Sequence, residues 1–430
     1  MSRALLSQIK NDWKENIWLV IELLVVALII WWLVLNILRT YKDSQYPLGA
    51  DIENVYAADI SYIDENGEKW NLESATSIEE CRVYGSGLHA MLARIRDLPS
   101  VESAALGSNA LPYIFSHMGG GLTYIDGKDT TEVYVNQRHM SPEGAKVLKL
   151  ESASGLTPDQ LQKILEQGLI LFSDPQDIDI IRQSEKYDVS KLIGKDLIVN
   201  GDPSQIVKAG GLIKTIRRND YELNFTSGTA VIPVDEHQVP ILQMNTLMVR
   251  VKPGRESDFE KSMQSEPTLI NPQRVALFRL RPLEHDKLLT TWNNEVTNRT
   301  YSAGILFLLI IVFIGLLGTF WYRVYLRTPE IAVRKSFGAT DGDIFRRFVS
   351  EALLLLLAAL VLAICLCIAL IDKLNAGLLE YPASFETWEW DFALAGLFTG
   401  ALMALMILIG VGIPAWRAMK IQPAIALKEE

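Results

Sequence analysis

Apolar residues gather in four long runs along the chain, and a polar middle segment separates the first run from the other three. The first run, 17–38, is almost wholly apolar apart from Glu22 and Asn36. A helix of that length reaches about 33 Å, which is enough to cross the hydrocarbon core of a membrane. The other runs of spanning length with few or no charges are 303–321, 352–371 and 392–413. The pattern therefore predicts four transmembrane helices, one before the middle segment and three after it.

The first run is expected to remain in the protein as a membrane helix. A cleavable signal peptide is the alternative, since such peptides also begin with an apolar stretch. However, 17–38 is longer than the apolar region of a signal peptide, and no small-x-small cleavage site follows Leu38. The sequence therefore favours retention.

Basic residues predict the orientation of the helices, because short cytoplasmic loops retain positive charge. The segment 322–351 is rich in such residues: Arg323, Arg327, Arg334, Lys335, Arg346 and Arg347. By contrast, Lys373 is the only basic residue of the acidic segment 372–391. We therefore expect 322–351 in the cytoplasm and 372–391 outside. Arg39 and Lys42, directly after the first run, depart from the rule locally.

These assignments fix the expected position of every segment. The expected cytoplasmic segments are 1–16, 322–351 and 414–430, and the expected extracytoplasmic segments are 39–302 and 372–391. Both termini are thus predicted in the cytoplasm, and the large middle segment is predicted outside.

The segment 39–302 shows alternating helix and strand patterns without low-complexity linkers, which predicts a folded α+β domain. One helix is predicted from apolar residues that share a face before Pro99: Leu88, Met91, Leu92, Ile95 and Leu98. Another begins at Thr157-Pro158, with Gln160 as the capping-box partner, and ends near Gly168.

Strands in this segment are predicted from β-rich runs beside turn dipeptides. One hairpin is expected in 122–135 around Asp126-Gly127, and another in 197–207 around Asn200-Gly201. The run 247–251 is a further β-rich stretch, and Pro253-Gly254 follows it. We expect two lobes, with a boundary that the pattern does not locate.

Composition and charge agree with a chain that lies partly in lipid. Hydrophobic residues make up 49% of the sequence and the mean hydropathy is +0.16. The net charge is −10 and the pI is near 5.2, so the chain lacks the basic surface that nucleic acid binding requires. We expect no nucleic acid partner. The cysteines Cys81, Cys365 and Cys367 offer neither a disulfide framework nor zinc spacing.

Signals of catalysis and metal binding are weak. The five histidines include no i,i+4 pair, which disfavours a metal site. The run Gly119-Gly120-Gly121 lacks the G-x-G-x-x-G spacing of a dinucleotide site, and no G-x-S-x-G nucleophile elbow occurs. We therefore expect neither a catalytic residue nor a metal ion, and an enzyme is disfavoured.

The most specific pattern lies in the predicted cytoplasmic segment, where 327–340 reads RTPEIAVRKSFGAT. Pro329 suits the first turn of a short helix, and Gly338 suits a left-handed residue at its end. A solvated basic loop is the alternative, but the order of the residues favours the helix.

This order resembles the permeases of the MacB and FtsX family, whose loop after the second span reads E-I-A-[IV]-R-K-[AS]-x-G-A. The matching residues are Glu330, Ile331, Arg334, Lys335, Gly338 and Ala339. Phe348 and Glu351 resemble the F-x-x-E of that family before the third span. Its closing pattern, P-A-x-R-A-x-x-x-x-P-x-x-A-L, is matched by Pro414, Ala415, Arg417, Ala418, Pro423, Ala426 and Leu427. The likeness is strong over 303–427 and weak in 39–302.

The resemblance implies a type VII ABC architecture in a bacterial inner (cytoplasmic) membrane. The external segment is then a MacB-like periplasmic domain, and the permease pairs with a second copy or a related permease. The matched loop residues are expected to couple the permease to a cytoplasmic ABC ATPase. No G-x-x-x-x-G-K-[ST] occurs, since Gly194-Lys195 is followed by Asp196, so ATP and Mg are expected on that partner chain. Membrane lipid and a periplasmic protein are the other expected partners.

Small and ionisable residues in the predicted spans are further candidates. Gly396, Gly400 and Ala404 form a small-x-x-x-small stripe that favours close helix packing, although such stripes also arise by chance. Glu22 and Glu351 lie within or at the edge of spans, where carboxylates usually face protein or water. Either one is an interfacial or a functional group.

Three classes of function remain open. The first is a permease subunit that uses ATP hydrolysis on another chain to export or extract a substrate. The second is a mechanotransmitter that regulates an extracytoplasmic enzyme without transport, and the third is a membrane-anchored sensor. The size of 39–302 favours the first, because it resembles the external domain of exporters more than the smaller domain of division-type members.

Overall fold

The computed structural model describes residues 13–62, 78–114, 118–126, 129–173, 189–221, 228–235, 246–265, 275–377 and 385–420. The chain divides into two compact units, Met1–Lys42 with Glu295–Glu430, and Asp43–Asn294. The segment 1–12, the turn residue Gly127 and the last motif residues Pro423, Ala426 and Leu427 lie outside the described residues.

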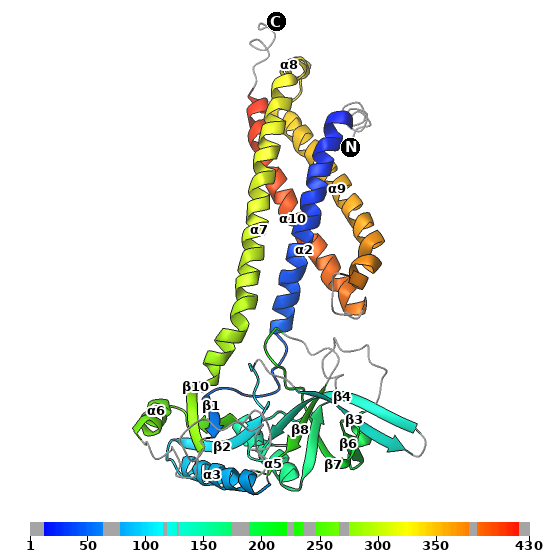
Figure 1. Cartoon of the computed structure of the whole chain (residues 1–430). Helices are drawn as coiled ribbons and strands as arrows, with labels where there is room; N and C mark the ends of the chain where they lie inside the picture. The colour runs from blue at the N-terminus through cyan, green and yellow to red at the C-terminus, as the bar shows by residue number, and fades with distance from the viewer. Residues whose placement is uncertain are drawn as a thin grey trace. The chain divides into compact units, whose positions relative to one another are not determined.

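The first unit is built from long helices (Figure 1). They are α2 (Trp13–Ser44), α7 (Leu283–Leu326), α9 (Asp341–Gly377) and α10 (Phe385–Met419), with the short α8 (Thr328–Ser336) between α7 and α9. Within the described part of the chain, these four long helices are long and apolar enough to cross a membrane. Each contains one of the four apolar runs of the sequence, so the predicted one-plus-three order is confirmed.

The helices share one apolar core, and their outer faces are apolar as well. Leu23 of α2 and Phe320 of α7 pack in this core with Ala359 of α9 and Met403 of α10. On the outside, Leu397 is 73% exposed, which is unfavourable in water and favourable in lipid. A helix that is hydrophobic all round is typical of a membrane span, and these helices together indicate a multi-pass membrane protein.

The second unit contains a mixed sheet. Its described strands are β1 (Val55–Tyr62), β2 (Val101–Ser108), β3 (Gly119–Asp126), β4 (Asp129–Met140), β5 (Leu169–Ser173), β6 (Asp196–Val199), β7 (Asp202–Ile213), β8 (Gly228–Pro233), β9 (Thr246–Val251) and β10 (Val275–Pro282). They follow the order β10-β1-β9-β2-β4-β3-β6-β7-β5-β8, and β4 also pairs with β8. This extra pairing closes six of the strands into a ring, while β10, β1, β9 and β2 extend from it as an antiparallel sheet.

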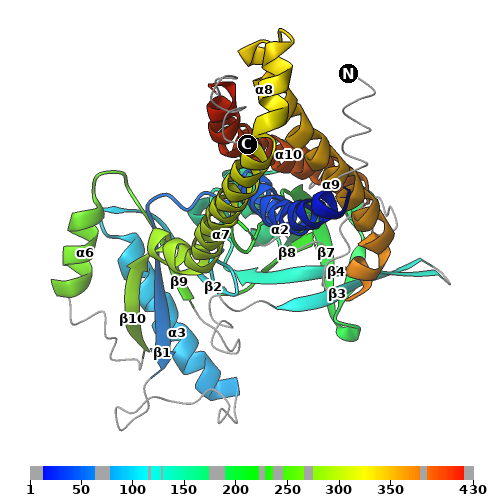
Figure 2. The same cartoon turned by 90° about the horizontal axis from the view of Figure 1, so that it is seen from above.

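Helices complete the second unit. They are α3 (Ile78–Arg96), α4 (Gly144–Val147), α5 (Pro158–Glu166), α6 (Glu256–Ser265) and the 3-10 turn η3 (Val189–Leu192). Figure 2 shows α3 and α6 on the side of β1 and β10, away from the β3–β4 hairpin. Residues of α3, such as Leu92, pack on the four-stranded part, and the ring encloses a separate cluster that includes Phe172. The predicted α+β domain between the first and second spans is thus confirmed.

Local signals in the sequence account for several of these elements. Thr157 accepts a hydrogen bond from the backbone N–H of Gln160, whose side chain bonds back to Thr157, so the predicted capping box is present. Asn200 and Gly201 both have positive φ, 51° and 70°, as the tight turn between β6 and β7 requires. The predicted pairing on either side of Asp126 is also present, as β3 with β4.

Candidate functional site

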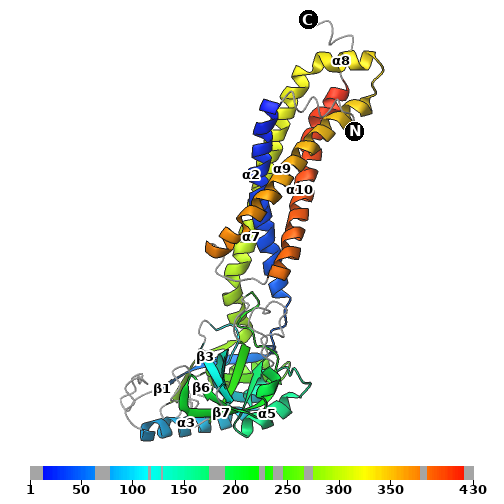
Figure 3. The same cartoon turned by 90° about the vertical axis from the view of Figure 1, so that its right-hand side faces the viewer.

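The short helix α8 lies across one end of the first unit (Figure 3). Pro329 occupies its first turn, where a missing N–H costs no helical hydrogen bond. At its other end the N–H of Gly338 donates to the carbonyl of Lys335, and the N–H of Ala339 donates to that of Arg334, both at 3.0 Å. Gly338 has φ of +96°, a left-handed value that glycine adopts without strain. This pair of bonds is a Schellman motif and sets where α8 stops.

The next helix is also capped at a defined residue. The Thr340 hydroxyl donates to Oδ2 of Asp343 at 2.6 Å, and the Asp343 N–H donates to Thr340 Oγ1 at 3.3 Å. The backbone N–H of Thr340 completes the box with a 3.0 Å bond to the same carboxylate. The turn between α8 and α9 is therefore fixed on both sides, by the end of one helix and the cap of the next.

The two faces of α8 differ sharply. Ile331 is 3% exposed and packs in the apolar core of the first unit, and Ala332 is fully buried. On the opposite face Val333 is 42% and Phe337 is 87% exposed. Since these two residues are four apart, they lie on the same side of the helix. An aromatic side chain with so little cover at the end of a helix bundle is a candidate contact for another protein.

The cations of the matched motif have different surroundings. Arg334 pairs with Glu330 one turn earlier, at 2.6 Å, and is 41% exposed. Lys335 is only 13% exposed, pairs with Asp341 at 2.7 Å and donates to the main-chain carbonyl of Met419. Lys335 therefore joins α8 to the start of α9 and to the end of α10, while Arg334 stays at the surface.

A buried ion cluster lies beneath α8. Glu351 of α9 accepts from Arg323 at 3.0 Å and from Arg327 at 2.8 Å, and its side chain is 3% exposed. Arg323 is nearly as buried, at 5%. Because Arg327 is also the residue before α8, this carboxylate holds the end of α7 and the start of α8 against α9. The sequence pattern singles out Glu351 but marks both arginines only as positive loop charges. Their i,i+4 spacing, directly after an apolar helix, is the sequence feature that indicates a shared partner.

The remaining predicted packing residues lie along α10. A Cβ atom on Gly396 would come within 2.7 Å of Cζ2 of Trp31, and one on Gly400 would come within 3.4 Å of Leu360. Ala404 packs partly buried against the core of the first unit. Gly396 is therefore the position at which a side chain is excluded, because an indole ring of α2 occupies the space.

Several buried titratable groups of the second unit bind main-chain atoms or lie apart from one another. Among the described residues, no three His, Cys, Asp or Glu side chains come together at a spacing that holds a metal ion. His139 is partly buried, and burial lowers its pKa. Burial, with the nearby charge of Arg218, lowers the pKa of Arg138 to about 10, and its guanidinium donates to main-chain carbonyls, including those of Ala110 and Leu111.

Comparison with known proteins identifies the C-terminal helical part of the chain, from within α7 to the end of α10. Residues 302–423 match the family described as FtsX-like permease C-terminal. This part is an FtsX-like permease domain. It includes α8, the buried cluster around Glu351 and all of α10. The relationship to MacB and FtsX permeases that the loop motif predicted is thereby confirmed.

Two proteins match longer stretches of the chain than the FtsX-like domain does. The probable export ATP-binding/permease protein MacB of Pseudomonas entomophila (strain L48) is 25% identical over 280 residues, 62% of this chain and 40% of that protein. The probable syringafactin export ATP-binding/permease protein SyfD of Pseudomonas syringae pv. tomato (strain ATCC BAA-871 / DC3000) is 26% identical over 190 residues, 44% of this chain and 27% of that protein. The chain thus spans less than half the length of either relative.

A solved structure also shows a remote likeness. It is the extracellular domain of the noncanonic ABC-type transporter YknZ from Gram-positive bacteria, with 10% identity and a TM-score of 0.29. The match covers 52% of this chain and all of that one. A likeness this distant does not bear on the fold.

Proposed function

We propose that this chain is the permease subunit of an ABC exporter of the MacB/FtsX type. In this proposal ATP and Mg bind to a partner ATPase in the cytoplasm, and hydrolysis drives a conformational change in the extracytoplasmic α+β domain. The observation that carries it is the exposed apolar face of α8, formed by Val333 and Phe337, within the FtsX-like domain. Both relatives have export and ATP binding in their names, which favours export over a purely regulatory role.

The contacts of α8 suit a helix that passes a displacement on to its neighbours. Its inner face is fixed by Ile331 in the core, by Lys335 on Met419 and by Arg327 in the buried cluster. A displacement of α8 is therefore shared by α7, α9 and α10. Of these, α7 is continuous from Leu283, directly after β10, to Leu326, so one helix joins the external domain to the segment before α8.

Disrupting the exposed face of α8 tests the proposed ATPase contact. The double variant V333D/F337D should reduce the amount of ATPase that co-purifies with the permease by roughly tenfold or more, because apolar anchors at the centre of an interface are worth about 2 kcal/mol or more each. Ser336→Asp, which adds a charge to an exposed residue of the same helix, is the matched control. The measurement is co-purification in mild detergent at equal membrane levels of permease.

The charged residues of α8 refine the same experiment. R334E should change mainly the association rate and the salt dependence, as expected for a charge at the rim of an interface. Lys335→Glu should disturb the packing of α8 on its own bundle, since Lys335 pairs with Asp341 and donates to the carbonyl of Met419. Full retention of ATPase by the V333D/F337D variant, or no ATPase with the wild type, would contradict the proposal.

The orientation implied by the proposal is tested by labelling. In a background without native cysteines, single cysteines replace Gln205 in β7 and Phe337 at the end of α8, both of which are exposed. A membrane-impermeant maleimide should label the first in cells whose outer barrier is permeabilised, and the second only after the membrane is disrupted. The reverse pattern would exclude a cytoplasmic α8 and with it the proposed coupling.

A further inference from the structure

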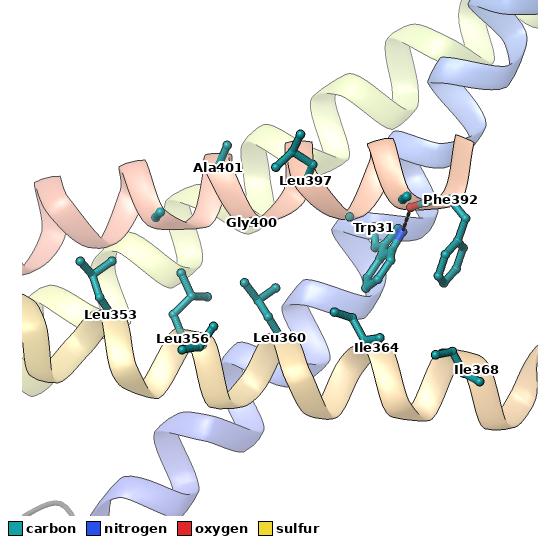
Figure 4. A pocket seen from close by; sticks show the side chains of 14 residues that line it. Trp31, Leu353, Leu356, Leu360, Ile364, Ile368, Phe392, Leu397, Gly400 and Ala401 are labelled. Atoms are coloured by element: carbon teal, nitrogen blue, oxygen red, sulfur yellow. Dashed lines mark hydrogen bonds between the residues drawn. The ribbon is translucent and has the colours of Figure 1, made fainter. Parts of the chain in front are cut away.

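A cavity of about 950 Å³ opens between α9 and α10 (Figure 4). Among the described residues, those that line it are all apolar: aliphatic side chains of α9 face the small residues and Phe392 of α10, and Trp31 of α2 closes one side. Its volume lies at the upper end of the range of about 300 to 1,000 Å³ found for ligand pockets. We call it the α9–α10 groove.

The groove exists because α10 carries small residues where α9 and α2 carry large ones. The indole N–H of Trp31 donates to the carbonyl of Phe392 at 3.0 Å, and the two rings lie 4.6 Å apart. Gly396 leaves the room that this indole occupies. Gly400 and Ala404, one and two turns further along, also line the groove and leave it open. Trp31 is therefore held in place as one wall of the groove.

The position of the groove indicates what fills it. The lining residues of α9 run from Leu353 to Ile368, a rise of about 22 Å at 1.5 Å per residue. This is most of the hydrocarbon core of about 30 Å that the same helices are apolar enough to cross. None of the described residues that line it is charged, so a soluble polar substrate finds no partner among them. Hydrocarbon chains are as apolar as the leucines of the wall and are the surrounding solvent.

A pair of opposite charges lies next to one end of the groove, outside its lining. Asp391 directly precedes the lining residue Phe392, and Lys42 of α2 lies 3.3 Å from both of its carboxylate oxygens. The pair is accessible, with side chains 38% and 22% exposed. Lys42 is also one of two basic residues that depart from the positive-inside pattern at the end of the first span. A cation and an anion side by side complement a zwitterion whose phosphate and ammonium groups are adjacent.

We propose that the α9–α10 groove is a binding site for one phospholipid with a primary ammonium headgroup. Its acyl chains lie along Leu360 and Gly400, its phosphate contacts Lys42, and its ammonium donates hydrogen bonds to Asp391. The proposal depends on the helices being in a membrane, and it is independent of the ATPase contact and of the transported substrate.

Photocrosslinking of the full-length protein tests the site. The protein is reconstituted in nanodiscs that contain phosphatidylethanolamine with a diazirine near the middle of one acyl chain, and adducts are mapped by mass spectrometry. Adducts should concentrate on 353–368 and 392–404 relative to Phe307, an exposed residue of α7 that serves as the internal reference for bulk lipid. Gly400→Leu should reduce the groove adducts by roughly tenfold, since the loss of about two buried methylene contacts already corresponds to that factor.

The controls separate filling of the groove from damage to the protein. Gly412→Leu adds the same side chain to the same helix at a position where an added Cβ atom would meet no other part of the protein within 4 Å, and should leave the adducts unchanged. If G400L is not monodisperse, Ala401→Leu, which also fills the groove, takes its place. Unchanged groove adducts in the folded filling variant, or adducts no more frequent than at Phe307, would overturn the proposal.

The headgroup is tested with equal amounts of photoactivatable phosphatidylethanolamine and phosphatidylcholine. The wild type should prefer the former, because a quaternary ammonium donates no hydrogen bond to a carboxylate. Asp391→Asn should remove that preference, and Lys42→Gln should weaken the binding of both lipids to a similar extent. Crosslinking of groove residues to a second copy of the chain, in place of lipid, would assign the groove to a protein interface and reject the lipid.

Discussion

Replacing Glu351 with glutamine is expected to destabilise the helical unit by about 3 to 5 kcal/mol, the cost of removing one partner from a buried ion pair. Glutamine keeps the size of the side chain but leaves two guanidinium groups, those of Arg323 and Arg327, without the carboxylate that they share. The unfolding temperature of the full-length protein in mild detergent should fall by several degrees. Because Arg327 also precedes α8, the same change should loosen α8.

The matched control is Glu330→Gln on α8. Its carboxylate pairs with Arg334 one turn away, and both side chains are about two-fifths exposed. Exposed helical pairs of this kind contribute about 0.3 to 0.5 kcal/mol. A similar loss of stability in the two variants would show that Glu351 acts as an ordinary surface charge, against the burial described above.

Replacing Arg250 with methionine is expected to destabilise the α+β domain by about 3 kcal/mol or more, because it leaves several buried or partly buried acceptors without their donor. Arg250 is 2% exposed and donates at 2.7 Å to the carbonyls of Val147, Glu53 and Asp51, and at 3.3 Å to the Asp51 carboxylate. Lys149→Met is the matched control, since Lys149 contacts the same carboxylate at 3.3 Å but is 47% exposed. It should cost less than about 1 kcal/mol.

The loss of stability caused by R250M has a defined dependence on pH. Partial burial raises the pKa of Asp51, but the backbone N–H of Glu53 and the charges of Arg250 and Lys149 outweigh it and hold the pKa below the usual 3.8. A carboxylate with a lowered pKa stabilises the fold above its unfolded pKa, and this contribution disappears as the pH falls through the folded pKa. The stability difference between wild type and R250M should therefore narrow below about pH 4 and stay constant near neutral pH. An unchanged gap at low pH would contradict the role given to Asp51.

Short-range patterns predicted the elements of this protein well. The apolar runs, the capping box at Thr157 and the turn at Asn200-Gly201 each depend on residues a few positions apart, and the structure has all three. The order of the strands depends on pairings between distant parts of the chain. The parallel contact of β4 with β8 closes the ring, and no local pattern marks which strand a given strand will meet.

The candidate site also combines features that depend on nearby residues with features that depend on distant ones. The end of α8 at Gly338 follows from one residue, and its geometry is as the motif predicted. The partners of Glu351 are 28 and 24 residues earlier in the chain, and the acceptor of Lys335 is a main-chain carbonyl 84 residues away. A backbone carbonyl leaves no mark in the sequence. For this reason the motif predicts one role for the adjacent residues Arg334 and Lys335, whereas the structure leaves Arg334 at the surface and binds Lys335 within the chain.

The pairing of β1 with both β9 and β10 has a consequence for how the protein is made. Tyr56 pairs with Pro282 on one side and with Val249 on the other, so the first strand of the domain finds its neighbours only when the last strands have been synthesised. Contacts of such long sequence separation form late and fold slowly. Until the ribosome has passed Val251, β1 offers unpaired backbone groups on both edges, and the edge that meets β10 stays unpaired until Pro282 has been made. Unpaired strand edges are the state in which chains aggregate or recruit chaperones. The start of α7 at the next residue then coincides with the point at which the sheet can close.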